Sequence, residues 1–556
     1  MASRISCAVA LLLATNHVLA TKSLLPRNNK GPLAFSLSAE TAQGQQINGL
    51  SRRNADIPLT NLSTIAYLVT LSIGTPGQKV RVVVDTGSDE LWVNPSCNSS
   101  TSASSGRAGN GVGSNDQNEC LASGRYDPAK SSTSKNLNKH GHIQYAKGKV
   151  SFDYYNDTVS QSDSGVTLNG LQFGVARKSE DMSEGILGLG FAENHNYTTF
   201  VGAVAQQGAA GGPGKVFSIG LASANQANAG TLVLGGLDTN RFTGPMMGVP
   251  ILPPPPSDTL VRYWVKLDSI GLTGSTVKSS SEGDGGVVSS GSDTSNKTYA
   301  NSGGPIVLDT GSTLSILPFV VMEALAKDLG ASTMQNSRAE FAKLTGRAPD
   351  TTASASIFPV PCSSLGLGSD VHSKENQAGL KRTVDFSFNN GAARIRVPLS
   401  EFSIQITDNL CCLGGISLDD GSSSSSSSTG TGIPDPASGV TLLLGATFLR
   451  GAYVVYDQTA SSVFMAPYAT CNGGTANLQA LASATAGAAG GFTGACSAAD
   501  SLVGGGAGGF AAAAASASAK GESDDSKKNA GLRSSNVSTS SLVAVFVPTM
   551  LMLLCA

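Results

Sequence analysis

The chain has 556 residues, of which 40% are hydrophobic and 14% charged, so its length predicts two or three domains with large cores. The 66 glycines and the aromatic content of only 6% indicate that part of the chain is not globular. The net charge of -2 falls to -8 when the basic segment 1–53 and residues 530–556 are left out, and no basic patch indicates a nucleic-acid partner.

The N-terminal segment is typical of targeting and processing sequences. Arg4 precedes an apolar run over residues 5–14, and small residues follow at 18–20, as in a secretory signal peptide that covers residues 1–20. A polar segment then ends in Arg52 and Arg53, a dibasic pair of the kind that secretory convertases cut. We therefore interpret residues 21–53 as a propeptide. The alternative is a disordered arm in which the arginine pair is incidental.

The middle of the chain is predicted to be all-β and mainly antiparallel. Short β-rich runs are bounded by Gly, Pro, Asn or Asp, at residues 66–73, 80–84, 143–145, 167–175 and 231–234. Helical periodicity is confined chiefly to residues 319–330 and 337–346.

Three segments with biased composition punctuate this pattern. A proline run at residues 253–257 predicts a stiff connector, and the Asp/Gly/Ser-rich segment 419–432 predicts a disordered surface insertion. From residue 472 the chain becomes rich in Ala, Gly and Ser, so residues 472–529 are expected to form a stalk without a core.

The tripeptide Asp-Thr-Gly occurs twice in similar surroundings. Asp85 and Asp309 each follow a run of β-branched residues and precede Thr-Gly-Ser. An apolar-apolar-Gly element comes after each copy, at residues 185–190 and 442–445. A single copy is usually an ordinary turn in which Gly lets the backbone bend. The duplication predicts two similar β lobes that contribute one aspartate each.

Two neighbouring aspartates can act as a base and an acid in the same reaction. Carboxyl groups about 3 Å apart in a shielded site share one proton, because both cannot ionise comfortably. The ionised group can take a proton from a water molecule while the protonated one polarises a carbonyl. Attack of that water on an amide then needs no covalent intermediate, and the pair works best in acid.

With these motifs, the chain resembles a pepsin-type (family A1) aspartic endopeptidase over residues 64–468. The resemblance is carried by IGTPGQ at 73–78, LGGLD at 234–238, YWVKLDSIGL at 263–272 and residues 442–467. It implies a bilobal fold, with lobes at residues 54–250 and 251–471 and an active-site cleft between them.

The resemblance also implies roles for the two motifs. Asp85 and Asp309 would be the catalytic pair, and Ser88 and Ser312 would hydrogen-bond their carboxylates. The residues expected to support the pair are Thr86, Gly87, Ser88, Thr310, Gly311 and Ser312.

A β-hairpin flap over the substrate is a further implication, and residues 142–160 fit it. Tyr145 would lie near the tip of the flap, with the Trp92 indole supporting it; alternatively, both are packing residues. The chain departs from the family pattern at residues 146–148, which read Ala-Lys-Gly where Gly-polar-Gly is usual, and at Ala446, where Asp is common. Neither departure removes the aspartate pair.

Seven of the nine cysteines lie between the signal peptide and the C-terminal tail, in agreement with an oxidising compartment. Cys97 and Cys120 flank an insertion and are predicted to form a disulfide. Cys362 is predicted to pair with Cys411 or with Cys412; the unused one is left for Cys471 or Cys496, and one thiol remains. Glycosylation of surface loops is predicted at the sequons of Asn61, Asn98, Asn156, Asn196 and Asn296.

Residues 530–556 resemble a GPI-attachment signal. The apolar tail 542–556 follows a polar spacer and a set of small residues around Asn529, which is the expected attachment residue, with Gly531 or Ser526 as alternatives. A weak tail anchor is the competing interpretation. With a GPI anchor, the chain would be similar to fungal yapsin-like proteases held at the plasma membrane or cell wall.

Other kinds of catalysis find little support in the sequence. Only five histidines occur, none in a motif that suits Ser/His/Asp chemistry, and HExxH and paired CxxC motifs are absent, so no metal or other cofactor is expected. We therefore predict a monomeric aspartic endopeptidase that cleaves proteins or peptides in acid at the cell surface. The alternative is a catalytically inactive protein of the same fold that binds cell-wall proteins or polysaccharide.

Overall fold

The computed structural model describes the part of the chain that carries the motifs. The described residues are 32–40, 66–97, 121–145, 148–161, 165–180, 182, 184–207, 214–223, 230–256, 258–274, 297–299, 302–331, 355–356, 358–370, 372–405, 409–418, 441–481 and 488–500. Several predictions therefore lie outside them: the signal peptide, most of the propeptide, the helix at 337–346, the insertion at 419–432, Cys120, Asn61, Asn98, Asn296, Asn529 and the GPI-attachment signal.

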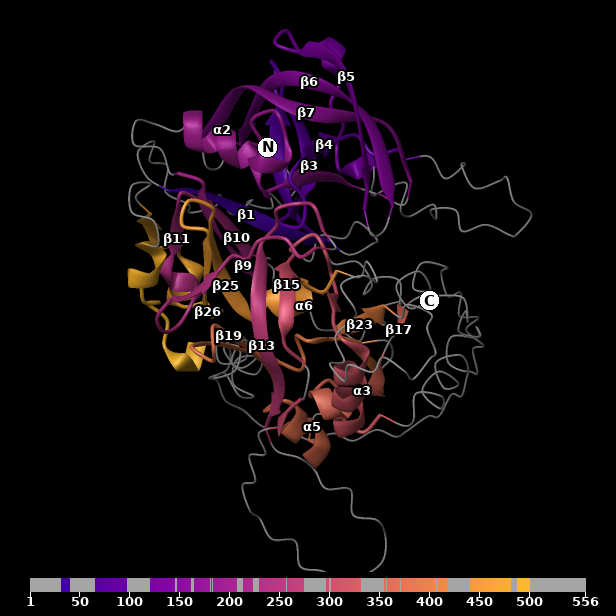
Figure 1. Cartoon of the computed structure of the whole chain (residues 1–556), viewed down its shortest axis with the longest axis vertical. Helices are drawn as coiled ribbons and strands as arrows, with labels where there is room; N and C mark the ends of the chain where they lie inside the picture. Colours follow the sequence, from indigo (N-terminus) through magenta and orange to yellow (C-terminus); the bar gives the residue numbers. More distant parts are fainter. Residues whose placement is uncertain are drawn as a thin grey trace, which may run out of the picture.

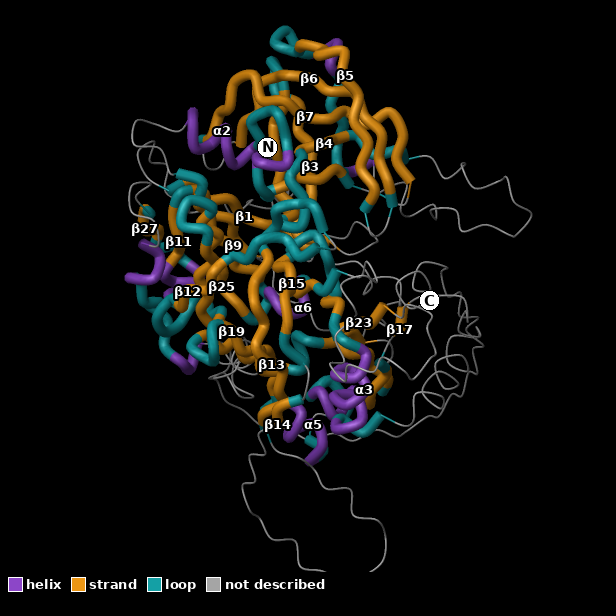
Figure 2. Tube along the Cα trace, in the orientation of Figure 1, coloured by secondary structure: helices purple, strands orange, loops and turns teal. Residues whose placement is uncertain are grey.

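The first half of the chain forms a closed arrangement of strands at one end of the molecule (Figures 1 and 2). The strands pair in the order β2-β3-β8-β4-β7-β6, and β6 also pairs with β2, which closes the ring. Their bounds are β2 Ala66–Ile73, β3 Gln78–Asp85, β8 Gly185–Gly188, β4 Leu91–Val93, β7 Val166–Glu180 and β6 Lys149–Gln161. Strand β5, Lys135–Gln144, pairs with β6 at the edge, and helix α2 spans Phe200–Gln207.

Strand β3 shows how the sequence places the first aspartate. Val80, Val82 and Val84 are buried and alternate with less buried residues, as expected for a strand with one face in the core. Asp85 is the last residue of β3. The strand therefore carries its carboxyl group to the point where the chain turns.

The second half builds another set of strands around β15, Gly304–Leu308, with pairing order β17-β23-β16-β24-β15-β13-β19-β20. The remaining bounds are β17 Ala355–Ser356, β23 Gly415–Leu418, β16 Ser315–Ile316, β24 Leu443–Leu444, β13 Trp264–Thr273, β19 Thr383–Phe388 and β20 Ala393–Pro398. Shorter elements are β14 Lys297–Thr298, β18 Pro359–Pro361, β21 Ser403–Gln405, β22 Leu410–Leu413, α3 Phe319–Asp328, α5 Lys374–Gly379 and α6 Ala446–Leu449. Helix α3 confirms the helix predicted after Pro318.

The two halves repeat one local topology around the Asp-Thr-Gly turns. In the first half, β3 runs parallel to β8, and β4 returns antiparallel to β8. In the second half, β15 runs parallel to β24, and β16 returns antiparallel to β24. The apolar-apolar-Gly elements are thus the strands β8 and β24 that run beside each aspartate. The predicted duplication and the mainly antiparallel all-β fold with two lobes are confirmed.

A third group of strands joins the two lobes. It continues the first sheet from β2 in the order β1-β10-β9-β25-β26-β12. Their bounds are β1 Leu33–Glu40, β10 Gly230–Leu234, β9 Val216–Leu221, β25 Ala452–Asp457, β26 Ser462–Pro467 and β12 Met247–Pro250. Residues 452–467 lie within the range predicted for the second lobe, 251–471, but they pair with β9 and β12 in this joining sheet.

Strand β1 belongs to the segment interpreted as a propeptide. It pairs antiparallel with β10 and, through its C-terminal end, with β2, and Phe35 is completely buried. Cleavage after Arg53 would therefore leave β1 bound within the sheet by backbone hydrogen bonds. The propeptide boundary itself stays a prediction.

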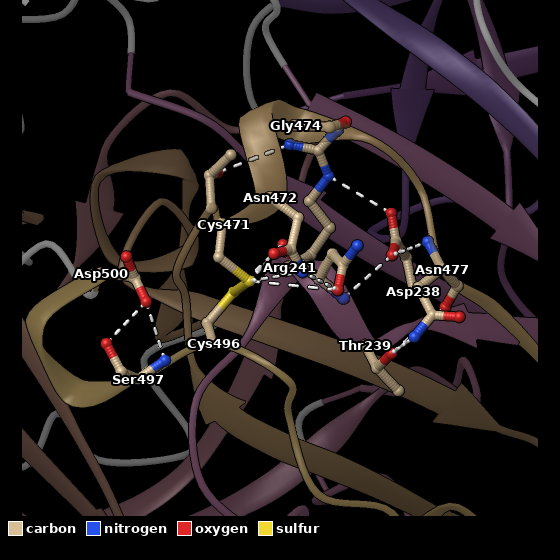
Figure 3. The surroundings of a disulfide bond; sticks show 12 residues. Asp238, Thr239, Arg241, Cys471, Asn472, Gly474, Asn477, Cys496, Ser497 and Asp500 are labelled. Carbon is tan, nitrogen blue, oxygen red and sulfur yellow. Dashed lines mark hydrogen bonds and ion pairs between the residues drawn. A yellow bond between two sulfur atoms is a disulfide. The ribbon is translucent and has the colours of Figure 1, made fainter.

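The prediction that residues 472–529 form a stalk without a core is wrong for the first part of this range, because the fold extends beyond residue 472. Strand β27, Leu478–Ala480, pairs with β11, Gly236–Asp238, and Cys471 is disulfide-bonded to Cys496 (Figure 3). Leu481, Ala489 and Cys496 are buried. We call residues 471–481 and 488–500 the C-terminal clasp. Small residues form it because backbone pairing and one disulfide hold it, so it needs few large side chains.

The disulfides between described cysteines decide some of the pairings that the sequence left open. Cys362 is bonded to Cys411, as predicted. The remaining cysteine of the adjacent pair, Cys412, was expected to pair with Cys471 or Cys496, but these two pair with each other and Cys412 is a buried thiol. Cys97 is disulfide-bonded, and its predicted partner Cys120 lies outside the described residues.

Two of the five sequons, at Asn156 and Asn196, lie among the described residues. Asn196 is exposed in the bend before α2, as a glycosylation site requires. Asn156 instead lies within strand β6 and is partly buried, so the surface-loop expectation is wrong for its position. The carbonyl oxygen of its side chain is buried there.

Candidate active site

The two aspartates lie at equivalent points of the repeated topology. Asp85 ends β3 and is 5% exposed, and Asp309 directly follows β15. In each turn the glycine two residues later donates its backbone N–H to the Oδ1 of the aspartate, at 2.8 Å in both cases. The two carboxyl groups are also in hydrogen-bond contact with each other.

Gly87 and Gly311 show why the pair needs glycine. A Cβ atom on Gly87 would lie 2.5 Å from the carboxyl carbon of Asp309, and one on Gly311 would lie 2.6 Å from that of Asp85. Neither glycine has a left-handed backbone. The chain bends at both glycines, as predicted, and glycine is also required because each turn packs directly on the carboxyl group of the other lobe.

Thr86 and Thr310 lock the two turns together. The backbone N–H of Thr86 donates to the Thr310 hydroxyl at 3.1 Å, and the N–H of Thr310 donates to the Thr86 hydroxyl at 3.0 Å. Each hydroxyl then donates to a carbonyl of the opposite lobe, at Leu308 and Val84. Both side chains are buried, so these bonds are shielded from water.

The serines do not support the aspartates symmetrically. The Ser88 hydroxyl donates to Oδ2 of Asp85, as expected. The Ser312 hydroxyl instead donates to the backbone carbonyl of Leu314 at 2.8 Å. The predicted bond between Ser312 and Asp309 is therefore absent from the structure, and Asp85 has the more fully hydrogen-bonded carboxylate.

This asymmetry agrees with the protonation of the pair. Burial raises the pKa of Asp309 well above its usual value, and the negative charge of Asp85 and its hydrogen bond to Asp309 raise it further. The Gly311 N–H and the positive charge of Arg262 oppose this effect only in part. Asp309 is therefore the carboxyl group that keeps its proton, while Asp85 accepts bonds from Gly87 and Ser88.

Tyr145 and Trp92 meet as the flap prediction requires. The Trp92 Nε1–H donates to the Tyr145 hydroxyl at 2.8 Å, and the indole is completely buried. The backbone N–H of Tyr145 donates to the Gly148 carbonyl at 3.0 Å. This bond joins the residue after β5 to the residue before β6. Burial and the charge of Asp85 raise the pKa of Tyr145, so its hydroxyl stays protonated. Ala146 and Lys147 lie outside the described residues.

Arg262 was not predicted as a site residue. Its guanidinium donates to the carbonyl oxygen of Gly87 and forms an ion pair with Asp258 at 2.8 Å, while 27% of the side chain is exposed. The sequence offers one signal, a cation directly before the matched stretch that begins at Tyr263. Its partner Gly87 lies 175 residues away along the chain, so no local pattern could reveal the contact.

At Ala446, the second position where the chain departs from the family pattern, the backbone forms a hydrogen bond to the turn of the second lobe. Ala446 is completely buried, and its N–H donates to the Ser312 carbonyl at 2.8 Å. The corresponding bond in the first lobe runs from the Gly190 N–H to the Ser88 carbonyl, also at 2.8 Å. The neighbouring Thr447 hydroxyl donates to the Gly414 carbonyl. The N–H of Ala446 therefore joins the start of α6 to the turn that follows Asp309.

Within the part of the chain that the structure describes, no group of three or more His, Cys, Asp or Glu is arranged to hold a metal ion. Among those same residues, no helix is long and apolar enough to cross a membrane.

An aspartate pair on duplicated β turns defines the site of an aspartic peptidase. The model of the eukaryotic aspartyl protease family matches residues 66–468, so the chain belongs to this family and is an aspartic-type endopeptidase. The match spans both turns and stops before the C-terminal clasp.

Similar fungal proteins support this assignment. "Probable aspartic-type endopeptidase opsB" of Aspergillus fumigatus is 28% identical over 73% of this chain and 69% of its own length. "Secreted aspartic protease 8" of Candida albicans is 28% identical over 72% of this chain and 75% of its own. "Aspartic proteinase 3" of Saccharomyces cerevisiae is 26% identical over 81% of this chain and 78% of its own.

Proposed function

We propose that Asp85 and Asp309 activate a water molecule that hydrolyses peptide bonds in protein substrates at acidic pH. The observation that carries this proposal is the contact between the two carboxyl groups, each seated against a glycine of the opposite turn. The interlocked Thr86 and Thr310 fix that contact in a buried setting. Acid favours the reaction because one proton must stay on the pair.

The asymmetry of the pair assigns a role to each carboxyl group. Asp85, as the carboxylate, takes a proton from the water while the water oxygen attacks the substrate carbonyl carbon. Asp309 gives its proton to the carbonyl oxygen, which produces a neutral tetrahedral intermediate. Asp85 then passes its proton to the leaving nitrogen as the C–N bond breaks, and Asp309 regains a proton from a hydroxyl of the intermediate. Atoms and charges balance, and no covalent enzyme intermediate forms.

Tyr145 would act by closing the site rather than by transferring a proton. Its hydroxyl is held by Trp92, and its raised pKa keeps it neutral. A hairpin of this kind positions substrate and excludes water. Loss of the phenol in Tyr145→Ala should therefore reduce turnover far less than loss of an aspartate.

We further propose that the enzyme passes through the secretory pathway and is held at the cell surface. The signal-like residues 1–20, the dibasic pair at Arg53, the disulfides and the GPI-like tail at 530–556 support this route. One similar protein is named a secreted aspartic protease. Phosphatidylinositol-specific phospholipase C should release the enzyme from intact cells. Release of nothing, together with a retained 542–556 peptide, would contradict the anchor.

Digestion of a denatured protein at pH 3 to 6, with and without a statine-containing inhibitor, tests the catalytic proposal. The inhibitor mimics the tetrahedral intermediate and should abolish cleavage. An inactive protein that binds wall components would show no cleavage at any pH in this range, even though both aspartates are present.

A further inference from the structure

His195 lies between two carboxylates directly beside the first catalytic turn. Its Nε2 is 2.7 Å from Oδ1 of Asp89, and its Nδ1 is 3.6 Å from Oε1 of Glu90. Only 17% of the imidazole is exposed, with 16% of the Asp89 side chain and 6% of the Glu90 side chain. Asp89 and Glu90 follow Ser88, the residue whose hydroxyl holds Asp85.

Because each ring nitrogen of His195 faces a carboxylate, the protonated imidazolium fits better than the neutral imidazole. A neutral imidazole has one N–H and one lone pair, so it would turn a lone pair toward one of the two carboxylates. The imidazolium has an N–H on both nitrogens and a positive charge between the two acids. Burial alone would lower the pKa of His195, but the hydrogen bond to Asp89 and the charges of Asp89 and Glu90 outweigh burial and raise it above 6.5.

Polar groups around the imidazole tie this cluster to the rest of the site. Asn194 donates to Oδ2 of Asp89 at 2.5 Å and exchanges two 3.0 Å bonds with the backbone of Val261. Val261 is the neighbour of Arg262, whose guanidinium reaches the Gly87 carbonyl. The turn from Gly87 to Glu90 is thus held by groups that converge on it from residues 194–195 and 261–262.

The remaining titratable neighbours do not replace His195 as a counter-charge. Tyr154 from β6 and Tyr197 both donate to Oε1 of Glu90, and burial together with Glu90 raises the pKa of each, so both stay neutral. The charged groups nearby are already paired with one another, Glu193 with Lys215 at 3.3 Å and Arg262 with Asp258 at 2.8 Å.

We propose that the imidazolium of His195 is a positioning group for the first catalytic turn, which it holds through Asp89 and Glu90 and releases when it loses its proton as the pH rises. This inference rests on the proposed catalytic role of Asp85. In acid the cation neutralises two poorly hydrated carboxylates. After deprotonation, Asp89 and Glu90 are left without a cation between them, and the turn that carries Ser88 and Asp85 loses the part of its support that the cation provides.

The direction of the pH effect follows from the raised pKa. The stabilisation is fully present below pH 6.5, the value of a free histidine, and is lost as the pH rises through the higher value of the folded protein. The enzyme would then lose its active structure on the alkaline side of this window through one identifiable residue.

The activity test compares full-length His195→Gln with wild type on one peptide substrate at pH 4. We expect kcat to fall about tenfold with KM within about threefold, because a displaced turn affects the reaction more than binding. His195→Arg keeps a cation with several donors and should retain more of kcat. His372→Gln, an exposed histidine of the second lobe, is the matched control and should equal wild type. Equal kcat in His195→Gln and His372→Gln would contradict the positioning role.

The structural test does not depend on catalysis, because it uses full-length Asp309→Asn as the parent. Its Tm should fall as the pH rises above 6.5, and this fall should vanish when His195→Gln is added. His140→Gln removes an exposed histidine that pairs with Asp153 at 2.6 Å, and it should leave the pH dependence of the parent unchanged.

A direct titration covers the case in which His195→Gln does not fold. NMR of the His195 ring in the Asp309→Asn parent should give a pKa above 6.5, and adding Asp89→Asn should lower it. A value at or below 6.5, or one that Asp89→Asn leaves unchanged, would overturn the proposal. If Asp309→Asn stayed fully active, the proposed catalytic pair would fail instead, and the titration would still report on His195.

Discussion

Thr86 and Thr310 each donate a backbone N–H to the other's hydroxyl, which makes the two lobes part of one buried hydrogen-bonded unit. The bonds cross a sequence separation of 224 residues. Because the same residues adjoin Asp85 and Asp309, the unit fixes the separation of the two carboxyl groups. The stability of the lobe interface and the geometry of the proposed catalytic pair therefore depend on these two bonds and on the two that the hydroxyls donate to Leu308 and Val84.

Replacing Thr86 with Val should test this coupling. The change keeps the shape but leaves the Thr310 N–H and the Leu308 carbonyl without their partner. We expect the free energy of unfolding to fall by about 1–3 kcal/mol and kcat to fall with it. Denaturant unfolding and steady-state kinetics measure both, with Thr86→Ser as the control that keeps the hydroxyl. A Val variant with unchanged kcat would show that the unit is structural only.

Replacing Gly87 or Gly311 with alanine should reduce kcat because the added methyl group would clash with the opposite aspartate. The added methyl group would lie 2.5 or 2.6 Å from the carboxyl carbon of the opposite aspartate, so the pair must separate. We expect kcat to fall by roughly 100-fold or more. Gly491→Ala is the control, since its Cβ would meet nothing within 4 Å. Wild-type kcat in Gly87→Ala would contradict the observed approach of the two turns.

Arg262 should lower the pH at which Asp309 loses its proton and should thereby affect the alkaline limb of activity. Its positive charge lowers the pKa of Asp309, so Arg262→Met should raise that pKa further and let Asp309 keep its proton to higher pH. The alkaline limb of the kcat/KM profile is expected to move to higher pH in Arg262→Met and to stay in place in Arg262→Lys. Movement of the limb to lower pH in the Met variant would be the opposite of this expectation.

The C-terminal clasp should contribute to stability although it lies outside the family match. Asp238 and Arg241 form a buried ion pair (Figure 3). The clasp contacts both of them: the Asn477 N–H donates to Asp238, and the Gly474 carbonyl accepts from Arg241. Cys496→Ser should lower the free energy of unfolding by about 3 kcal/mol because it opens a loop of 25 residues. A chain ending at Thr470 should have a lower Tm than one ending at Asp500, and equal Tm values would show that the clasp is dispensable.

The sequence predicted those parts of the site that local pattern specifies. Runs of β-branched residues place Asp85 and Asp309 at strand ends, and the resemblance to pepsin-type peptidases predicts the contact between Tyr145 and Trp92. It did not predict Arg262 and His195, because their partners lie 175 and 106 residues away. Contacts of this length are decided by the packing of elements, which no local pattern records.

Composition was misleading where the backbone, rather than large side chains, holds the fold. The Ala/Gly/Ser-rich residues after 472 indicate a stalk, yet strand β27 pairs with β11, and the disulfide between Cys471 and Cys496 joins two parts of this segment to each other. The motif symmetry was misleading as well: Ser88 bonds to its aspartate, whereas Ser312 bonds to Leu314. Identical motifs in the two lobes therefore adopt different hydrogen bonds.

The central claim, that Asp85 and Asp309 together activate the water, is tested most directly by peptide hydrolysis in the separate variants Asp85→Asn and Asp309→Asn. Each should be secreted and folded with the Tm of a native protein, yet turnover at pH 3 to 6 should be lost, because an amide can neither take the proton from water nor give one to the carbonyl. Near-normal turnover in either folded variant would contradict the account.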